Sequence, residues 1–255
     1  MSRILSSLTT LKSRALSLMS LSVCIVCRSS CVNEHSKSIS SDPVDLASCT
    51  ELWWVMTERE LMLQMWASNP AKVKEMTQWC FMNPFEGRSR SERKRMEKDF
   101  GNRMLEGLGR TTPTSNWTTM CVETFVEFVL NKLFKDVHSP KYKPEDIGHC
   151  AGHVGVWPDF ENKLAIWEVK ARTWNTAGSA GDKIFAAPWK YGPLAVHKKK
   201  PVIILLVARQ EQEMREKYGF FGGQIAPAHR AQLSDWESKN IHYVPFTRLL
   251  KRFER

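Results

Sequence analysis

The chain has 255 residues, a formal net charge of +10 at pH 7 and a pI near 9.3. Its seven cysteines are scattered and give no disulfide framework, which argues against a small disulfide-stabilised secreted protein and favours a reducing compartment. The excess of lysine and arginine indicates a polyanionic partner such as nucleic acid, because these side chains neutralise phosphate groups.

Residues 1–41 form a basic segment rich in serine and leucine, and the first 33 residues contain no Asp or Glu. This composition resembles a mitochondrial transit peptide. The apolar stretch 15–27 has the character of a secretory signal instead, but serines interrupt it and it is too short for an ordinary membrane span. An extension without a targeting role is a third interpretation. We expect an intracellular protein, with mitochondrial import as the alternative, and no stable membrane association.

Residues 42–105 are expected to be largely helical, with a break at Asn83-Pro84, and to form an accessory region. Two dense basic runs, 88–95 and 197–200, can each follow a nucleic-acid backbone. The alternatives are an exposed charged helix for the first run and the solvated start of a buried strand for the second. A zinc-like spacing near the N-terminus lies in an apolar context that argues against a metal site. Its residues are Cys24, Cys27, Cys31 and His35.

The segment 120–134 is expected to be a helix, because its apolar residues cluster on one side at about 100° per residue. The apolar stripe consists of Val122, Phe125, Val126, Val129, Leu130, Leu133 and Phe134. Glu123 lies near the edge of this stripe, whereas Glu127 is expected to turn further toward solvent. Glu123 is therefore a candidate acidic residue for a metal site, acting directly or through water. The alternative is a solvated glutamate on the flank of the helix.

The most informative window is 156–160, Val-Trp-Pro-Asp-Phe, which is followed nine positions after its aspartate by a Glu-Val-Lys triplet. Alternating apolar and polar residues predict a strand that places Glu168 and Lys170 on one face. A hairpin through a turn at 161–163 would bring Asp159 beside Glu168, because opposed residues of paired strands have Cβ atoms only about 4.5–5.5 Å apart. Two carboxylates and an ammonium group would then converge.

This set of side chains suits Mg²⁺, a hard cation that keeps several waters and takes one or two carboxylates together with phosphate oxygens. The ion can activate a water and offset the charge that develops on a phosphate. Lys170 can orient that water, lower its pKa or stabilise the pentacovalent state. The alternative is a surface strand with an ordinary Glu–Lys pair, since charged residues commonly line a solvated sheet face.

The remaining elements follow downstream. The segment 176–183 contains two glycines, so its backbone can approach a phosphate closely, and a plain surface loop is the alternative. The run 201–208 is almost entirely apolar and predicts a strand buried on both faces. A helix is expected at 229–239 and a short strand at 241–244. The resulting order of helix, three strands, helix and strand indicates an α/β fold with a mixed sheet flanked by helices.

The Pro-Asp pair and the run from Glu168 to Lys183, Glu-Val-Lys-Ala-Arg-Thr-Trp-Asn-Thr-Ala-Gly-Ser-Ala-Gly-Asp-Lys, resemble the PD-(D/E)XK nuclease superfamily. The longer run is similar to the signature of type II restriction endonucleases from bacteria and large DNA viruses, in which a Lys-Tyr pair follows, here Lys190-Tyr191. Upstream, the Trp-Thr-Thr run at 117–119 resembles the group's segment before its helix glutamate, although Val122 replaces the usual glycine. The resemblance covers roughly residues 117–246.

The resemblance implies a restriction-endonuclease-like core with the order αβββαβ, in a nuclease domain over residues 106–255, and a Mg²⁺-dependent endodeoxyribonuclease activity. The implied catalytic residues are Asp159, Glu168, Lys170 and Glu123. The implied metal-binding positions are Asp159, Glu168 and Val169. The less specific candidates for DNA contacts are Thr176, Gly178, Lys183 and Lys190.

Double-stranded DNA is the partner that the resemblance implies, and the region 42–105 would assist its recognition or the formation of a homodimer. Two further hypotheses stay open. The same centre can serve DNA repair, recombination or the degradation of host DNA, or the chain can be a DNA-binding module on an inactive nuclease fold. The presence of Asp159, Glu168 and Lys170 weighs against the inactive module, because such a descendant would be free to lose one of them.

Overall fold

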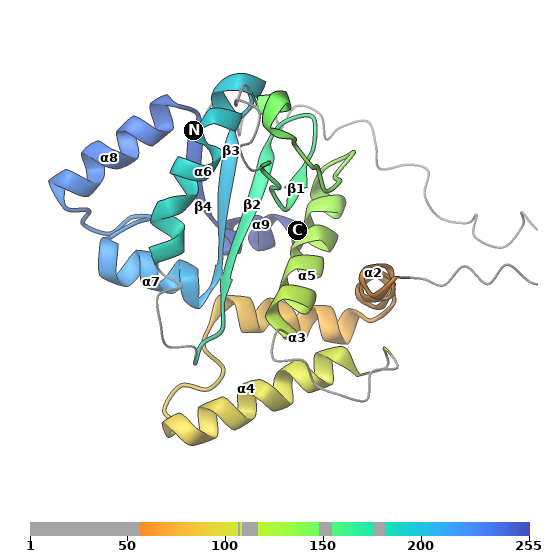
Figure 1. Cartoon of the computed structure of the whole chain (residues 1–255). Coiled ribbons are helices and arrows are strands. Elements are labelled where there is room, and N and C mark those ends of the chain that lie inside the picture. Colours follow the sequence, from red (N-terminus) through yellow and green to blue (C-terminus); the bar gives the residue numbers. More distant parts are fainter. Residues whose placement is uncertain (1–56, 107, 109–116, 148–154, 176–181) are drawn as a thin grey trace, which may run out of the picture. The chain divides into compact units, whose positions relative to one another are not determined.

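A four-stranded mixed sheet in the order β1-β2-β3-β4 lies at the centre of the structure, which is a computed structural model (Figure 1). The two-residue strand β1 (Phe160–Glu161) runs antiparallel to β2 (Ile166–Arg172). The strands β3 (Val202–Ala208) and β4 (Ile241–Pro245) are both parallel to β2. The prediction of an α/β chain with a mixed sheet flanked by helices is confirmed. The structure describes residues 57–106, 108, 117–147, 155–175 and 182–255.

One face of the sheet is covered by a group of helices that share a large apolar cluster, the α5-side core. The helices are α2 (Glu58–Ser68), α3 (Pro70–Phe81), α4 (Arg90–Leu105), α5 (Trp117–Leu133) and α9 (Phe246–Phe253). Trp167 and Val169 of β2 and Leu205 of β3 face this cluster. The helices within the region predicted as accessory, α2 to α4, therefore contribute to the same core as α5 and the sheet.

The starts of the N-terminal helices follow from local sequence. Thr57 caps the N-terminus of α2 and Ser89 caps that of α4, and each forms a capping box with the glutamate three residues later, Glu60 or Glu92. Asn69 caps α3, whose first residue is a proline. These caps satisfy backbone N–H groups that the first turn of a helix leaves without partners.

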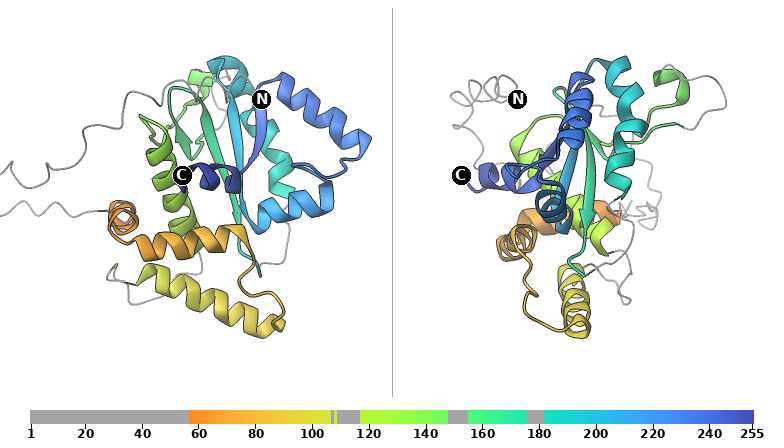
Figure 2. Two further views of the ribbon diagram at one scale, coloured as in Figure 1. Left: turned by 180° about the vertical axis from the view of Figure 1, so that it is seen from behind. Right: turned by 90° about the vertical axis from the view of Figure 1, so that its left-hand side faces the viewer.

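The opposite face of the sheet packs against α6 (Asp182–Lys198), α7 (Arg209–Tyr218) and α8 (Pro227–Ser238) in the α6-side core. Figure 2 shows α6 and α9 on opposite sides of the sheet. Ile166 belongs to the α6-side core, whereas Trp167 belongs to the α5-side core. Strand β2 therefore alternates between the two layers, and Glu168 and Lys170 lie on the α6 side.

The observed order of elements differs from the predicted one, because α6 lies between the second and third strands. Two neighbouring parallel strands need a crossover connection, and α6 provides it between β2 and β3. The sequence conceals this helix, since it contains Pro188 and Pro193, which usually interrupt a helix. The predicted elements at 201–208, 229–239 and 241–244 are present as β3, α8 and β4.

Within the part of the chain that the structure describes, no helix combines the length and the apolar character needed to cross a membrane.

Candidate active site

The hairpin of β1 and β2 brings the predicted carboxylates together. Phe160 pairs with Trp167 and Glu161 pairs with Ile166, so the same register places Asp159 opposite Glu168. The Oδ2 atom of Asp159 accepts a hydrogen bond of 2.5 Å from the backbone N–H of Val169. The predicted pairing is thus present.

The turn of this hairpin lies slightly later than the predicted turn at 161–163. The Oδ1 atom of Asn162 accepts hydrogen bonds from the backbone N–H groups of Leu164 at 3.0 Å and Ala165 at 2.9 Å. The N–H of Asn162 donates to the carbonyl of Ala165 at 3.0 Å. An asparagine side chain that satisfies the backbone two and three residues onward is a common way to stabilise a tight turn.

Glu168 and Lys170 lie two positions apart on β2, and the ammonium group of Lys170 donates to Oε1 of Glu168. Only 4% of Glu168 is exposed. Its other carboxylate oxygen, Oε2, has no hydrogen-bond partner among the described residues. A buried polar atom without a partner is costly, so Glu168 retains a coordination position that is available to a ligand.

Asp159 and Glu123 add two further carboxyl groups. Burial and the charge of Glu168 raise the pKa of Asp159 to about 7, against the opposing effects of the Val169 N–H and Lys170. Burial, followed by the charges of Asp159 and Glu168, raises the pKa of Glu123 to about 7 as well. The side chain of Glu123 therefore reaches from α5 into the electrostatic field of the hairpin. Near neutral pH, both carboxyl groups can take up or release a proton.

The prediction that Glu127 turns toward solvent is wrong. This glutamate is 5% exposed, and its two carboxylate oxygens accept hydrogen bonds of 2.8 and 2.6 Å from Arg59 of α2. Arg59 also donates to Oγ of Ser139 at 2.8 Å. Helical periodicity marked Glu127 as polar but could not reveal Arg59, which lies 68 positions away in the sequence. The pair satisfies a charge that packing of α2 on α5 has buried.

Tyr191 of α6 was not predicted as a site residue, although it formed part of the Lys-Tyr pair in the resemblance. Its side chain is fully buried, and burial together with the nearby charge of Glu168 raises the pKa of its hydroxyl group. The hydroxyl oxygen lies 3.5 Å from the backbone carbonyl oxygen of Trp157. Tyr191 thus brings α6 next to both the Glu168 carboxylate and the chain segment that leads to Asp159.

The other predicted site residues are distributed around this centre. Lys190 is exposed on α6 with its Nζ atom 4.7 Å from the centre of the Tyr191 ring, and its charge lowers the pKa of Asp159. Lys183 is exposed at the start of α6. The side chain of Val169 is in the α5-side core, so only its backbone can serve as a ligand. Thr176 and Gly178 lie outside the described residues.

A cleft of about 600 Å³ opens beside Glu123 and Asp159. Most of its wall is apolar and includes Met120, Trp157 and Phe160. Arg59 also lines the cleft. This cleft cannot be predicted from local sequence, because its walls come from α2, α5 and two separate loops.

The residues present fit a magnesium ion as a partial protein shell. Asp159 and Glu168 offer two carboxylates, and Oε2 of Glu168 is buried without a partner among the described residues. Oxygen ligands of this kind suit Mg²⁺, which commonly keeps waters in its remaining positions. The described residues contain no group of three or more His, Cys, Asp or Glu side chains placed to hold a metal ion. The fit is thus to an ion held by two carboxylates, water and substrate.

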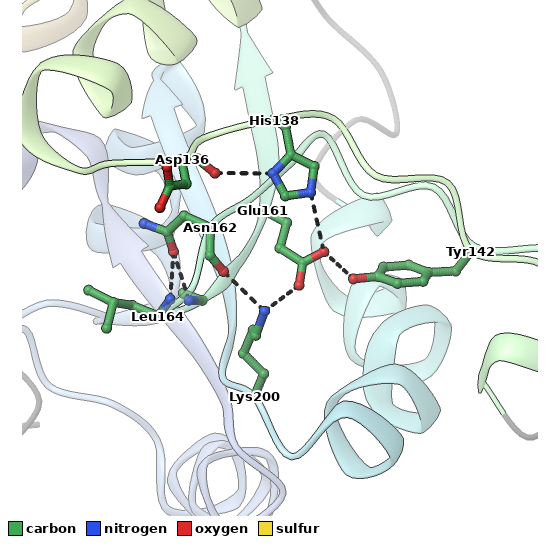
Figure 3. A network of polar contacts seen from close by, with 8 residues as sticks. Asp136, His138, Tyr142, Glu161, Asn162, Leu164 and Lys200 are labelled. Carbon is green, nitrogen blue, oxygen red and sulfur yellow. Dashed lines mark hydrogen bonds and ion pairs between the residues drawn. The ribbon is translucent and has the colours of Figure 1, made fainter.

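A second polar cluster lies at the other end of the same hairpin, around Glu161 (Figure 3). The carboxylate of Glu161 accepts hydrogen bonds from the Tyr142 hydroxyl and the Lys200 ammonium group, and His138 Nε2 lies 3.9 Å away. Lys200 also donates to the carbonyl of Asn162 at 3.0 Å. One lysine of the basic run 197–200 is therefore committed to a structural contact.

A scan against protein-family models, a search of curated proteins and a search of solved structures each found no match to this chain.

Proposed function

We propose that the chain is a Mg²⁺-dependent endonuclease that hydrolyses phosphodiester bonds in double-stranded DNA, in the manner of the PD-(D/E)XK nucleases. The observation that carries the proposal is the convergence of Asp159, Glu168 and Lys170 on the β1–β2 hairpin, with Glu123 reaching the same field from α5. Buried like charges near a lysine are costly for folding and commonly mark a functional site.

Asp159 and Glu168 would hold the magnesium ion, and the backbone carbonyl of Val169 is the third candidate ligand. When bound, Mg²⁺ supplies positive charge that lowers the pKa of a water and offsets the charge of the phosphate. Lys170 would donate a hydrogen bond to the attacking water or to a phosphate oxygen and stabilise the developing charge. Glu123, with a pKa of about 7, can accept a proton near neutral pH and so suits proton transfer through water.

The charge distribution on α4 supports DNA as the substrate. Arg90, Lys94 and Lys98 are exposed at intervals of four residues, which places them along one side of this helix. Glu97 lies next to Lys94 on the helix, three residues later, but is only 5% exposed and accepts a hydrogen bond from the backbone N–H of Trp174 at 2.8 Å. This contact attaches α4 to the chain that leaves β2, so a basic surface is held near the end of the strand that carries Lys170.

Cleavage of unmethylated plasmid and viral DNA by the purified full chain tests the proposal. We expect products with Mg²⁺ and none with EDTA, with Asp159→Asn or with Lys170→Ala. Asp235→Asn and Lys239→Ala are matched controls, because this ion pair of 2.7 Å lies on the surface of α8, with both side chains about half exposed. Cleavage that survives both substitutions at the hairpin would place the active site elsewhere.

The products also separate the alternatives. A restriction role predicts discrete fragments and sensitivity to base methylation. A repair, recombination or degradative role predicts cutting at ends, branches or unpaired stretches without a fixed sequence. Folded protein that binds DNA but does not cut it with Mg²⁺ would instead indicate a DNA-binding module.

A further inference from the structure

The cleft beside the candidate active site contains an exposed aromatic ring. Of the tryptophans that the structure describes, six are buried and two are exposed: Trp157 at 64% and Trp189 at 80%. Trp157 lines the cleft and lies two residues before Asp159 in the sequence. The ring takes no part in the core at this place, so its exposed face is available to a ligand in the cleft.

The backbone that carries Trp157 is held firmly on both sides. Val156 exchanges backbone hydrogen bonds of 3.1 and 2.9 Å with Tyr142. Gly155 passes so close to this partner that a Cβ atom would lie 2.5 Å from the Tyr142 carbonyl oxygen. The next residue, Pro158, is buried, and Asp159 is bound to Val169. The indole of Trp157 therefore projects from a backbone segment that is hydrogen-bonded on both sides and lies next to the predicted reaction centre.

The charges in the cleft are compatible with a nucleotide. Arg59 and Lys141 line it together with Glu58, and Arg59 is paired with Glu127. The guanidinium of Arg59 lies 6.0 Å from the centre of the Phe160 ring. Asp159 and Glu123 also line the cleft, and a bound magnesium ion would offset their charge. The volume of about 600 Å³ lies within the range of about 300–1,000 Å³ typical of ligand pockets.

We propose that the cleft receives an unpaired nucleobase, stacked on Trp157, from the DNA strand that is cut. Neighbouring base pairs cover both faces of a base inside a duplex, so only an unpaired or extruded base can present a face to the indole. The inference extends the proposed nuclease function, on which it rests, by naming the substrate as DNA with unpaired nucleotides at the cleavage site. It favours a repair, recombination or degradative role over cutting of perfectly paired sites.

Binding measurements with the full chain test this inference without relying on cleavage. Fluorescence anisotropy in EDTA would compare one sequence as a single strand, as a perfect duplex and as a duplex with a central unpaired stretch. We expect the two forms with unpaired bases to bind more tightly. Trp157→Ala should weaken their binding by roughly 5- to 150-fold, which corresponds to the loss of one base–aromatic stack. Trp157→Phe should retain most of the affinity.

Trp189→Ala is the matched control, because Trp189 is also exposed but lines a different cleft on α6. This substitution should leave all three affinities unchanged. A 2-aminopurine base in the unpaired stretch gives a second readout: its fluorescence should be quenched by the wild-type chain and by Trp189→Ala, but not by Trp157→Ala. Both exposed tryptophans can be replaced without loss of core packing.

Equal affinity for the three DNA forms, or equal losses in Trp157→Ala and Trp189→Ala, would overturn the inference. These outcomes leave the proposed nuclease function intact if plasmid cleavage still depends on Mg²⁺ and Asp159. Conversely, a preference for unpaired DNA that depends on Trp157 would support the cleft as a binding site even if no cleavage were found.

Discussion

Two buried glutamates on one hairpin, Glu161 and Glu168, each pair with a lysine but differ in the other groups that contact their carboxylates. Each is almost fully buried, and each is paired with a lysine, Lys200 or Lys170, whose side chain is 24% exposed. Burial raises the pKa of Glu161, but hydrogen bonds from Lys200 and Tyr142 outweigh it and hold this pKa below its usual value. Glu168 has one oxygen without a partner among the described residues and lies close to Asp159.

The difference separates a structural ion pair from a candidate reactive one. At Glu161, Tyr142 and Lys200 donate to the carboxylate and join the hairpin to the loop after α5 and to the segment between α6 and β3. At Glu168, Lys170 is the hydrogen-bond donor, and two further carboxyl groups lie nearby. These are Asp159 and Glu123, whose pKa values are raised. A fold retains such a costly arrangement where function requires it. A buried Glu–Lys pair therefore indicates a functional site only when the glutamate lacks other hydrogen-bond donors that would make it structural.

The largest expected difference is in cleavage. Glu168→Gln should lower the rate of plasmid cleavage by at least about 10³-fold, because it removes a proposed metal ligand and the partner of Lys170 at the proposed reaction centre. Glu161→Gln makes the same chemical change at the other end of the hairpin and should leave the rate of the folded protein within a few-fold. Initial rates measured below the unfolding temperature of each variant give the comparison. Equal losses in the two variants would remove the distinction between the glutamates.

Stability should respond in the reverse order. Glu161→Gln weakens two charge-assisted hydrogen bonds in a buried cluster and should lower the free energy of unfolding by roughly 2–3 kcal/mol. Glu168→Gln removes repulsion between buried carboxylates and should leave the free energy of unfolding unchanged or raise it. Urea unfolding without divalent cations, followed by tryptophan fluorescence, measures both. A large loss in Glu168→Gln would show that Lys170 and Glu168 form a structural pair instead.

Much of the hairpin could be predicted from local sequence, and its partners could not. Alternation along β2 and the Pro-Asp pair predicted that Asp159 lies opposite Glu168, because strand periodicity and a short turn leave few registers. The amphipathic pattern likewise predicted α5. The Glu161 cluster has no such local sign, since Tyr142 lies 19 and Lys200 lies 39 positions from Glu161.

The errors have similar causes. The periodicity of α5 alone predicts that Glu127 faces solvent, but α2 covers that side of the helix and supplies Arg59. Helix α6 was missed because two prolines interrupt its pattern, although the parallel pairing of β2 and β3 requires a crossover. The exposure of Trp157 depends on how distant segments pack. The sequence alone therefore does not distinguish this exposed tryptophan from the tryptophans in the core.

The two ends of the hairpin should also differ in how pH affects stability. Asp159 and Glu123 have folded-state pKa values of about 7, above the usual range near 4, so the folded chain keeps protons that the unfolded chain releases. Without metal, these two groups contribute free energy of unfolding below about pH 4, and this contribution is lost as the pH rises through about 7. Its size is on the order of 1–2 kcal/mol after allowance for solvent screening.

Glu161 should act in the opposite direction, because its folded-state pKa is lowered and its contribution is lost as pH falls below the usual range. Urea midpoints measured across this pH range test both signs. Asp159→Asn should flatten the decline toward neutral pH, whereas Glu161→Gln should remove part of the decline in acid. Saturating Mg²⁺ should raise the midpoint of the wild type near pH 7 but not that of Asp159→Asn. A neutral-pH decline that persists in Asp159→Asn would contradict the assignment.

The smallest expected effects come from the tyrosine near each glutamate. The Tyr142 hydroxyl donates to Glu161, so Tyr142→Phe should lower the free energy of unfolding by about 1–2 kcal/mol and leave cleavage unchanged. The Tyr191 hydroxyl makes a long contact of 3.5 Å with the Trp157 carbonyl and otherwise faces the charged Glu168 region, so Tyr191→Phe should change stability by less than about 0.5 kcal/mol.

Tyr191→Phe should nevertheless affect cleavage, since it removes a hydroxyl beside Glu168 and the segment that displays Trp157. Because the two substitutions delete the same atom from buried rings, their packing costs largely cancel in the comparison. We expect cleavage to fall a few-fold in Tyr191→Phe alone, with stability falling in Tyr142→Phe alone. If both tyrosines affected only stability, the Glu168 end of the hairpin would be a structural cluster like that of Glu161, and its unpartnered oxygen would have no functional meaning.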